Sequence, residues 1–318
     1  MSKQASFSGD ISWPKISIVT PSFNQGKYIE ETILSVISQN YPNLEYIIID
    51  GASTDETVEI IKKYSDKITY WISEPDKGQS DALNKGLKKC TGEIFNWINS
   101  DDFLAKDALF KIAQAFVDKD TVVVAGAVQN IDGKGNCELF VNDHLGILEM
   151  LETDAKYIYH QPGIWMKMVV MASTGIFKVD YHYCFDQEYF LRYLLISDKV
   201  KYIPDILAYF RLHNHSKTVS SSHLFLLDFN RMYKEFVITV KGTGLEKFAR
   251  QKSLHYEWPL IHYSLNNRHE KRLIILFLAV KAILKDPAHR LNRKSVGWLK
   301  HIVFGKQKDK KSNFKTNL

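Results

Sequence analysis

The sequence predicts an α/β protein built on a doubly wound, mostly parallel β-sheet. In the first 130 residues, short runs rich in β-branched residues alternate with helix-like segments of about 10 residues. The strand-like runs are apolar almost throughout, which is typical of strands that are covered on both faces. Beyond residue 130 the alternation ends, so we expect a small antiparallel portion and then a C-terminal helical extension.

The elements of the first part follow from local patterns. Apolar runs predict strands, and apolar residues at helical spacing predict helices. Ser53 and Glu56 have the S-x-x-E spacing of a capping box, which marks the start of a helix. We expect strands at residues 15–20, 44–50, 68–73, 93–98 and 121–129, and helices at 28–39, 55–64, 80–89 and 106–116.

The second part of the chain is mostly helical. The glycines at 133 and 135 predict a turn at residues 131–136 that joins two antiparallel strands. After it we expect a helix at 186–196, short strands at 200–203 and 206–210, and helices at 223–240, 245–266, 269–285 and 296–304. The chain then divides into a tail at 1–14, a domain at 15–220, a helical extension at 221–305 and a basic disordered tail at 306–318.

Composition indicates a globular protein of the reducing cytoplasm. Apolar residues make up 45% of the 318 residues and charged residues 25%. The three cysteines form no C-x-x-C pair, which argues against a disulfide framework or a cysteine zinc site. The N-terminus lacks the apolar core of a signal peptide, and no apolar run approaches the roughly 18 residues of a membrane span.

Charge is distributed unevenly. From residue 268 onward there are 14 basic and 3 acidic residues, whereas the rest of the chain has 28 basic and 33 acidic residues. A basic amphipathic helix can lie in the interface of an anionic membrane. The alternative is that residues 273–284 pack on the domain at 15–220 and only the final lysines are solvated.

Acidic residues gather where the predicted parallel strands end. Asp50, Asp76 and Asp81 follow the second and third strands, and Asp101 and Asp102 follow the fourth. Each of them alone has a structural interpretation, as a turn cap or an acid in the first turn of a helix. Sheet geometry brings their loops to one crevice, so together they favour a divalent cation, Mg²⁺ or Mn²⁺. Neither a G-x-G-x-x-G nor a P-loop motif follows a predicted strand.

Two long segments carry a resemblance to a known family. "ISIVTPSFNQGKYIEETILSVISQNYPNLEYIIIDGASTDETVEII" and "DKGQSDALNKGLKKCTGEIFNWINSDD" resemble the nucleotide-sugar-dependent glycosyltransferases of family 2, from about residue 16 to residue 116. "CFDQEYFLRY" and "YFRLHNHSKT" are similar to later segments of the family. The resemblance implies a GT-A fold, with a nucleotide-binding half at 15–130 and an acceptor half at 131–220. It also implies inverting transfer of a sugar to a hydroxyl of a glycan or lipid-linked acceptor, in cell-surface polysaccharide synthesis.

The resemblance assigns nucleotide-sugar binding to the strand-end loops. The residues implied to line the nucleoside pocket or to meet the base and ribose are Thr20, Pro21, Ser22, Asp50 and Asp81. Lys77 and Gly78 are implied to hold the sugar or the diphosphate, Asp101 to face the ribose or the diphosphate, and Arg211 to neutralise phosphate. A UDP-sugar is the expected donor, with GDP and dTDP as alternatives.

The resemblance also implies a metal site and a catalytic base. Asp102 is the expected ligand of Mg²⁺ or Mn²⁺, although Asn99 replaces the first acid of the strict D-x-D pattern. His213 approaches the metal or the diphosphate. Asp186 aligns with the base, with Glu188 as the second choice; a helix cap is the structural alternative for Asp186.

A few segments have a weaker assignment. "HQPGIWM", residues 160–166, is similar to a segment that approaches donor sugar and acceptor, but Trp165 is expected in the core. A zinc pair of His213 and His215 is disfavoured because no further ligand lies nearby. The rival functions are a nucleotidyltransferase, which would need a glycine-rich basic loop after the first strand, and a catalytically silent nucleotide-sugar-binding protein. Nucleic acid is not expected as a partner.

We therefore expect the protein in the cytoplasm, with peripheral contact to the inner face of the plasma membrane through its basic C-terminal helices.

Overall fold

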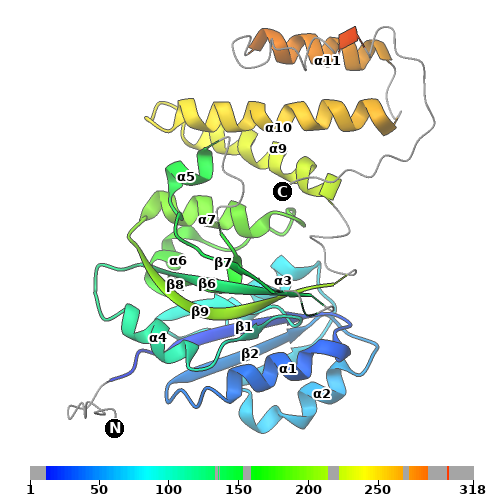
Figure 1. Ribbon diagram of the computed structural model, residues 1–318. Coiled ribbons are helices and arrows are strands. Elements are labelled where there is room, and N and C mark those ends of the chain that lie inside the picture. The colour runs from blue at the N-terminus through cyan, green and yellow to red at the C-terminus, as the bar shows by residue number, and fades with distance from the viewer. Residues whose placement is uncertain are drawn as a thin grey trace. The chain divides into compact units, whose positions relative to one another are not determined.

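The protein is described by a computed structural model that covers residues 12–132, 135, 137–152, 159–213, 222–267, 272–285 and 299–300. The chain forms two compact units (Figure 1). The first consists of Met1–Asp143, Tyr159–Val179 and Arg192–Leu212, and the second of His144–Ile158, Asp180–Leu191 and His213–Leu318.

The first unit is built on a mixed sheet, and the α/β prediction is confirmed. Its described residues form a 9-stranded sheet in the order β3-β2-β1-β4-β8-β6-β9-β5, with β7 paired to β6. The strands are β1 (Ile16–Ser22), β2 (Leu44–Asp50), β3 (Tyr70–Ser73), β4 (Ile94–Trp97), β5 (Phe103–Leu104), β6 (Val123–Asp132), β7 (Cys137–Phe140), β8 (Ile164–Lys167) and β9 (Val200–Leu212).

Parallel pairing brings four strand ends to one edge. β1 pairs with β2 and β4, and β2 pairs with β3, all in parallel. In this register Ser22 lies beside Asp50, and Asp50 beside Ser73. The loops that follow these strands therefore start at the same level, which we call the carboxyl edge. The antiparallel portion consists of the pairs that β8 makes with β4 and β6, β7 with β6, and β5 with β9.

Helices cover both faces of the parallel half. Ile16 and Ile18 of β1 belong to a buried cluster with residues of α1 (Gly26–Ile37), α2 (Thr57–Lys63) and α4 (Ala108–Ala115). Val19, on the opposite face, lies against Gly86 of α3 (Gln79–Leu87), where a Cβ would come within 2.6 Å of the valine side chain. Successive side chains of a strand point to opposite faces, so continuously apolar strands are required here.

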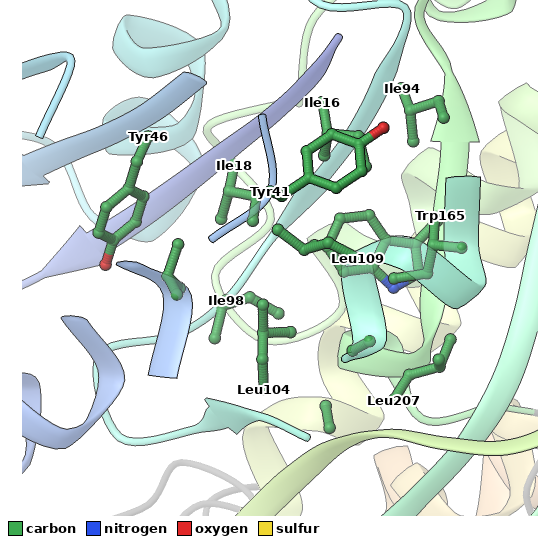
Figure 2. Packing of buried hydrophobic residues seen from close by; sticks show 14 of the residues in the cluster. Ile16, Ile18, Tyr41, Tyr46, Ile94, Ile98, Leu104, Leu109, Trp165 and Leu207 are labelled. Atoms are coloured by element: carbon green, nitrogen blue, oxygen red, sulfur yellow. The ribbon is translucent and has the colours of Figure 1, made fainter. Parts of the chain in front are cut away.

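The core cluster extends from the parallel strands into the antiparallel ones. Figure 2 shows Ile16, Ile18 and Ile94 of the parallel strands near Trp165 of β8 and Leu207 of β9. Trp165 is fully buried in this cluster, as predicted. Its packing ties β8 and β9 to the parallel strands within one unit.

A buried carboxylate fastens the sheet at the end opposite the carboxyl edge. Glu45 accepts hydrogen bonds from Ser17 Oγ (2.5 Å), Thr91 N (2.6 Å) and Thr91 Oγ1 (2.7 Å), and pairs with Lys15 Nζ at 2.7 Å. Its side chain is 5% exposed. Burial raises the pKa of Glu45, but the hydrogen bonds from these residues outweigh it and lower the pKa to about 2.

Two sequence predictions were wrong in detail. Helix α2 begins at Thr57 without a side-chain cap, because Ser53 Oγ bonds Asp50 and the Asn24 N–H instead of forming a capping box with Glu56. The two strands predicted around Pro204 are one strand, β9, which runs from Val200 to Leu212. A register shift against β6 beside Gly126 lets the strand continue.

The second unit is helical in its described residues. It contains α5 (Ile147–Leu151), the start of α7 (Phe185–Ile196), α9 (Ser222–Thr239), α10 (Glu246–Asn267) and α11 (Arg272–Lys285). These helices confirm the predicted periodicity up to residue 285; most of the helix predicted at 296–304 lies outside the described residues. None of the described helices combines the length and apolarity that a membrane crossing requires.

Candidate active site

The ends of β1 and β2 form the centre of the carboxyl edge. Thr20, Pro21 and Ser22 close β1, and all three are buried. Thr20 Oγ1 lies 3.1 Å from Tyr46 Oη, so its hydroxyl has a partner in the protein. Ser22 Oγ is buried and makes no hydrogen bond within the described residues. Because buried polar groups are normally bonded, this hydroxyl is suited to meet a ligand at the strand end.

Asp50 makes hydrogen bonds to the loops at the ends of the strands. It is fully buried, and its carboxylate accepts hydrogen bonds from the Ser53 N–H (2.9 Å), Ser53 Oγ and Ser73 Oγ (2.6 Å). Ser53 Oγ in turn accepts the Asn24 N–H at 2.8 Å. Asp50 therefore joins the loops after β1, β2 and β3, which is the turn-capping role that the sequence allowed.

The loop before α3 is shaped by acids and a glycine. The Gly78 N–H donates to Asp76 Oδ1 at 2.7 Å, and the Lys77 N–H donates to Asp81 Oδ2 at 3.1 Å. Gly78 has φ 107° and ψ 178°, a conformation almost restricted to glycine. Lys77 itself is exposed at the surface.

The Asp101–Asp102 pair sits in a tight turn after β4. The Asp102 N–H donates to the Asn99 carbonyl at 3.0 Å, which closes the turn. Thr32 Oγ1, from helix α1, donates to the carbonyl oxygens of Ser100 (3.0 Å) and Asp102 (2.6 Å). Asn99 Nδ2 lies 3.1 Å from Asp102 Oδ2, so the residue that replaces the first acid of the motif supports the second carboxylate.

Arg211 of β9 completes the same cluster. Its N–H donates to Asp102 Oδ1 (3.0 Å), its Nε to the Asp101 carbonyl (3.0 Å), and its Nη2 to Glu31 Oε2 (2.7 Å). The guanidinium lies 4.9 Å from the ring centre of Tyr28 and 5.3 Å from that of Phe103. These contacts fix Arg211 against the turn, beside the carboxylates, with two aromatic rings in cation–π range.

The electrostatics of the pair suit a cation. Burial and the neighbouring charge of Asp101 raise the pKa of Asp102 well above its ordinary value. Asp102 is 1% exposed and Asp101 is half-buried, so Asp101 offers the more accessible oxygens. Oxygen donors with excess negative charge fit Mg²⁺ or Mn²⁺, which commonly take one or two protein carboxylates and share the rest of their coordination with phosphate. Among the residues described, no three His, Cys, Asp or Glu side chains surround one metal position.

The predicted base and His213 belong to the second unit. Asp186 lies in the first turn of α7, is half-buried, and accepts the Gln187 N–H at 2.8 Å through Oδ1. Glu188, two residues on, is 5% exposed. His213 follows β9 directly and is half-buried. Their roles toward a donor or metal stay predictions, and His215 lies outside the described residues.

The predicted loops do follow parallel strands that end at one edge of the sheet, but the residues that hold these loops were not predicted. Thr32 lies on the buried face of α1 together with Ile29, Ile33 and Val36. A polar residue among these apolar positions is the sequence feature that could have indicated a buried hydrogen bond. Nothing in the sequence pointed to Glu31 as a partner of Arg211, because the two are 180 residues apart.

Comparison with known proteins agrees with this architecture. The model of the family described as "Glycosyl transferase family 2" matches residues 17–171. An uncharacterized glycosyltransferase of Mycobacterium tuberculosis is 30% identical over 194 residues, which are 59% of this chain and 71% of that protein. The poly(ribitol-phosphate) beta-N-acetylglucosaminyltransferase TarS of Staphylococcus aureus is 23% identical over 258 residues. The match covers 79% of this chain but only 45% of TarS.

Solved structures show the same fold. A crystal structure of a TarS fragment in complex with UDP-GlcNAc superposes with a TM-score of 0.62 at 18% identity, over 85% of this chain and 80% of the fragment. The mannosyltransferase PcManGT from Pyrobaculum calidifontis, in complex with GDP-Man and Mn²⁺, gives a TM-score of 0.55 at 16% identity, over 91% and 84% of the two chains. The fold is therefore that of the GT-A glycosyltransferases, and the chain belongs to glycosyltransferase family 2.

Proposed function

We propose that the protein transfers a sugar from a nucleoside-diphosphate sugar to a hydroxyl of a glycan or lipid-linked acceptor, with inversion at the anomeric carbon. The observation that carries the proposal is the clamped Asp101–Asp102 turn, which lies on the same sheet edge as the buried Ser22 hydroxyl, a group that no described residue bonds. One part of this edge offers oxygens to a cation that would in turn bind the diphosphate, and the other offers a buried polar surface to a nucleoside.

The proposed donor is a UDP-sugar. The TarS structure with UDP-GlcNAc supports this choice, and the mannosyltransferase structure makes a GDP-sugar the alternative. In this scheme Thr20, Pro21 and Ser22 line the nucleoside pocket, Asp50 and Asp81 fix the loops around base and ribose, and Lys77 with Gly78 meets the diphosphate or sugar.

The proposed metal is Mg²⁺ or Mn²⁺, held by Asp102 with help from Asp101 and His213. When bound, it would neutralise negative charge on the departing diphosphate. The protein's own contribution is to keep the carboxylates in place: Asn99 and the Arg211 main chain each hold one oxygen of Asp102.

Asp186 is the proposed base, which takes the proton of the acceptor hydroxyl as the new bond forms. Its partial exposure supports this choice over Glu188, because Glu188 is buried and less able to meet an acceptor from solvent.

The test uses donor hydrolysis, in which water replaces the unknown acceptor. A thermal-shift panel of nucleoside diphosphates and their sugars, with and without Mn²⁺, first identifies the donor. Asp186→Asn should then bind that donor within a few-fold of wild type, while hydrolysis falls at least ~100-fold, the usual scale for an acid–base group. Normal hydrolysis in this variant would reassign the base. Stabilisation by the donor with no hydrolysis under any condition would favour a silent binding protein, and release of diphosphate from a nucleoside triphosphate would favour a nucleotidyltransferase.

The proposed setting is cell-surface polysaccharide synthesis, in the cytoplasm and in peripheral contact with the inner face of the plasma membrane. The poly(ribitol-phosphate) named as the acceptor of TarS supports a polymer as the acceptor.

A further inference from the structure

Helix α11 carries a continuous apolar stripe that no described residue covers. Leu273, Phe277, Val280 and Leu284 are spaced by four, three and four residues, so they lie along one side of the helix. Their exposed fractions are 79%, 65%, 42% and 74%. We call these four residues the α11 stripe.

Other residues of α11 are buried, which shows that the stripe is not simply the surface of a poorly packed helix. Ala279 and Ile283 are buried, and they lie about 100° around the helix from the stripe. Helix α11 packs against α10, beside which it runs in Figure 1. One side of α11 is therefore used in packing within the second unit, and a different, equally apolar side is left exposed. A contiguous exposed apolar patch of this kind marks a protein or membrane interaction site.

Charge distinguishes between the possible partners. Lys281, beside the stripe, is exposed, and from residue 268 onward the chain has 14 basic and 3 acidic residues. A second copy of the chain would bring the same positive charge to the stripe. So would residues 286–318, which have 9 basic and 2 acidic residues. An anionic surface, in contrast, is attracted by every one of these charges.

We propose that the α11 stripe is a membrane-docking face, which inserts its four apolar side chains into the interface of a bilayer that contains anionic lipid. Basic residues around an inserted apolar face act together, because the apolar side chains enter the acyl boundary while the cations remain among the headgroups. The inference rests on the peripheral location proposed above and gives it a defined surface. Docking through α11 would hold the enzyme at the membrane that contains a lipid-linked acceptor.

The experiment is sedimentation of the full-length protein with vesicles of phosphatidylcholine alone or of phosphatidylcholine with 30% phosphatidylglycerol. We expect binding to the anionic vesicles only, and a loss of at least ~10-fold in affinity between 0.1 and 0.5 M NaCl, because the attraction is screened. Phe277→Glu should weaken binding at least ~10-fold, since a charge replaces an inserted aromatic ring. Ile238→Glu is the matched control: Ile238 is 74% exposed on α9, in the same unit, and this variant should bind as wild type does.

Three outcomes would overturn the inference. Phe277→Glu could bind vesicles as tightly as wild type, or wild type could fail to bind anionic vesicles at all. Alternatively, light scattering could show that wild type is a dimer which Phe277→Glu converts to a monomer, so that a second copy covers the stripe. Donor hydrolysis is measured on the same samples. If Phe277→Glu loses vesicle binding but hydrolyses the donor normally, the result supports docking through the α11 stripe. If wild type does not hydrolyse the donor, the proposed activity is refuted, while the vesicle-binding result still stands.

Discussion

The hydroxyl of Thr32 is a sensitive point of the site, because it is the contact from α1 that holds the Asp101–Asp102 turn. Thr32 is fully buried, and its Oγ1 donates one shared proton to the carbonyl oxygens of Ser100 and Asp102. Thr32→Val keeps the shape of the side chain but removes this donor. Leaving buried acceptors without their donor costs about 1–3 kcal/mol, so we expect about 2 kcal/mol of lost stability.

This loss has two readouts. In a unit of this size, about 2 kcal/mol lowers the unfolding temperature by about 4–8 °C, which differential scanning fluorimetry resolves. If the loosened turn must be ordered again when the donor binds, part of the same cost appears in affinity. A loss of about 1.4 kcal/mol in the binding free energy of the donor corresponds to a tenfold weaker Kd. Calorimetry with the donor and Mn²⁺ measures this change.

Thr32→Ser is the matched control, because it retains the hydroxyl and loses only the methyl group. It should cost about 1 kcal/mol through the lost apolar contact and leave donor affinity unchanged. If Thr32→Val matches Thr32→Ser in both unfolding temperature and donor affinity, the shared proton contributes nothing to the turn.

Three further predictions concern the backbone of Gly78, the charge of Glu45 and the hydrogen bonds by which Arg211 holds the Asp101–Asp102 turn. Gly78→Ala should cost about 1–3 kcal/mol in urea unfolding, because its φ of 107° is strained for alanine; an unchanged urea midpoint would mean that the loop relaxes freely. Glu45 should contribute about 3 kcal/mol to the free energy of unfolding, and this contribution should be complete above pH 4.5. It should decline as the pH falls toward 2, because the pKa of Glu45 in the folded protein is about 2. At pH 3 about 2 kcal/mol of the contribution should be lost. Glu45→Gln should lack this part of the pH dependence, and urea melts from pH 7 to pH 3 compare the two proteins. Arg211→Lys should lower the unfolding temperature and weaken donor binding about tenfold, because lysine cannot form the fork to the Asp101 carbonyl and Glu31; a defect in turnover alone, with normal binding, would contradict the clamp.

The sequence predicted the parallel half of the fold well because each element there is locally determined. Strands such as 44–50 are short, apolar and bounded by turn residues, and the structure has β2 at Leu44–Asp50. The two-residue strand β5 and the pairing of β8 were not foreseen, because they depend on contacts between distant segments. The capping box failed for a similar reason: Ser53 has the right spacing, but tertiary partners occupy its hydroxyl.

The candidate site could be predicted as a set of loops but not as a network. Strand topology alone places Ser22, Asp50 and the Asp101–Asp102 turn at one edge. The bonds that fix the turn come from Thr32 and Arg211, which lie 70 and 109 residues from Asp102 in the sequence. Such partners carry no local signature, so a single sequence leaves them unassigned.

The acids of the carboxyl edge also show why structural and functional interpretations of one residue need not compete. Asp50, Asp76 and Asp81 each accept a main-chain N–H from a loop, and Asp102 accepts one from strand β9. A loop whose N–H groups are fixed in this way needs little rearrangement to receive a ligand, and preorganisation of this kind favours binding. The arrangement has an electrostatic cost, since burial together with the charges of Asp81 and Asp50 raises the pKa of Asp76. A ligand that brings cations to this edge relieves that repulsion while it uses the loops already in place, so the residues that hold the fold at the carboxyl edge are also those that make it a binding site.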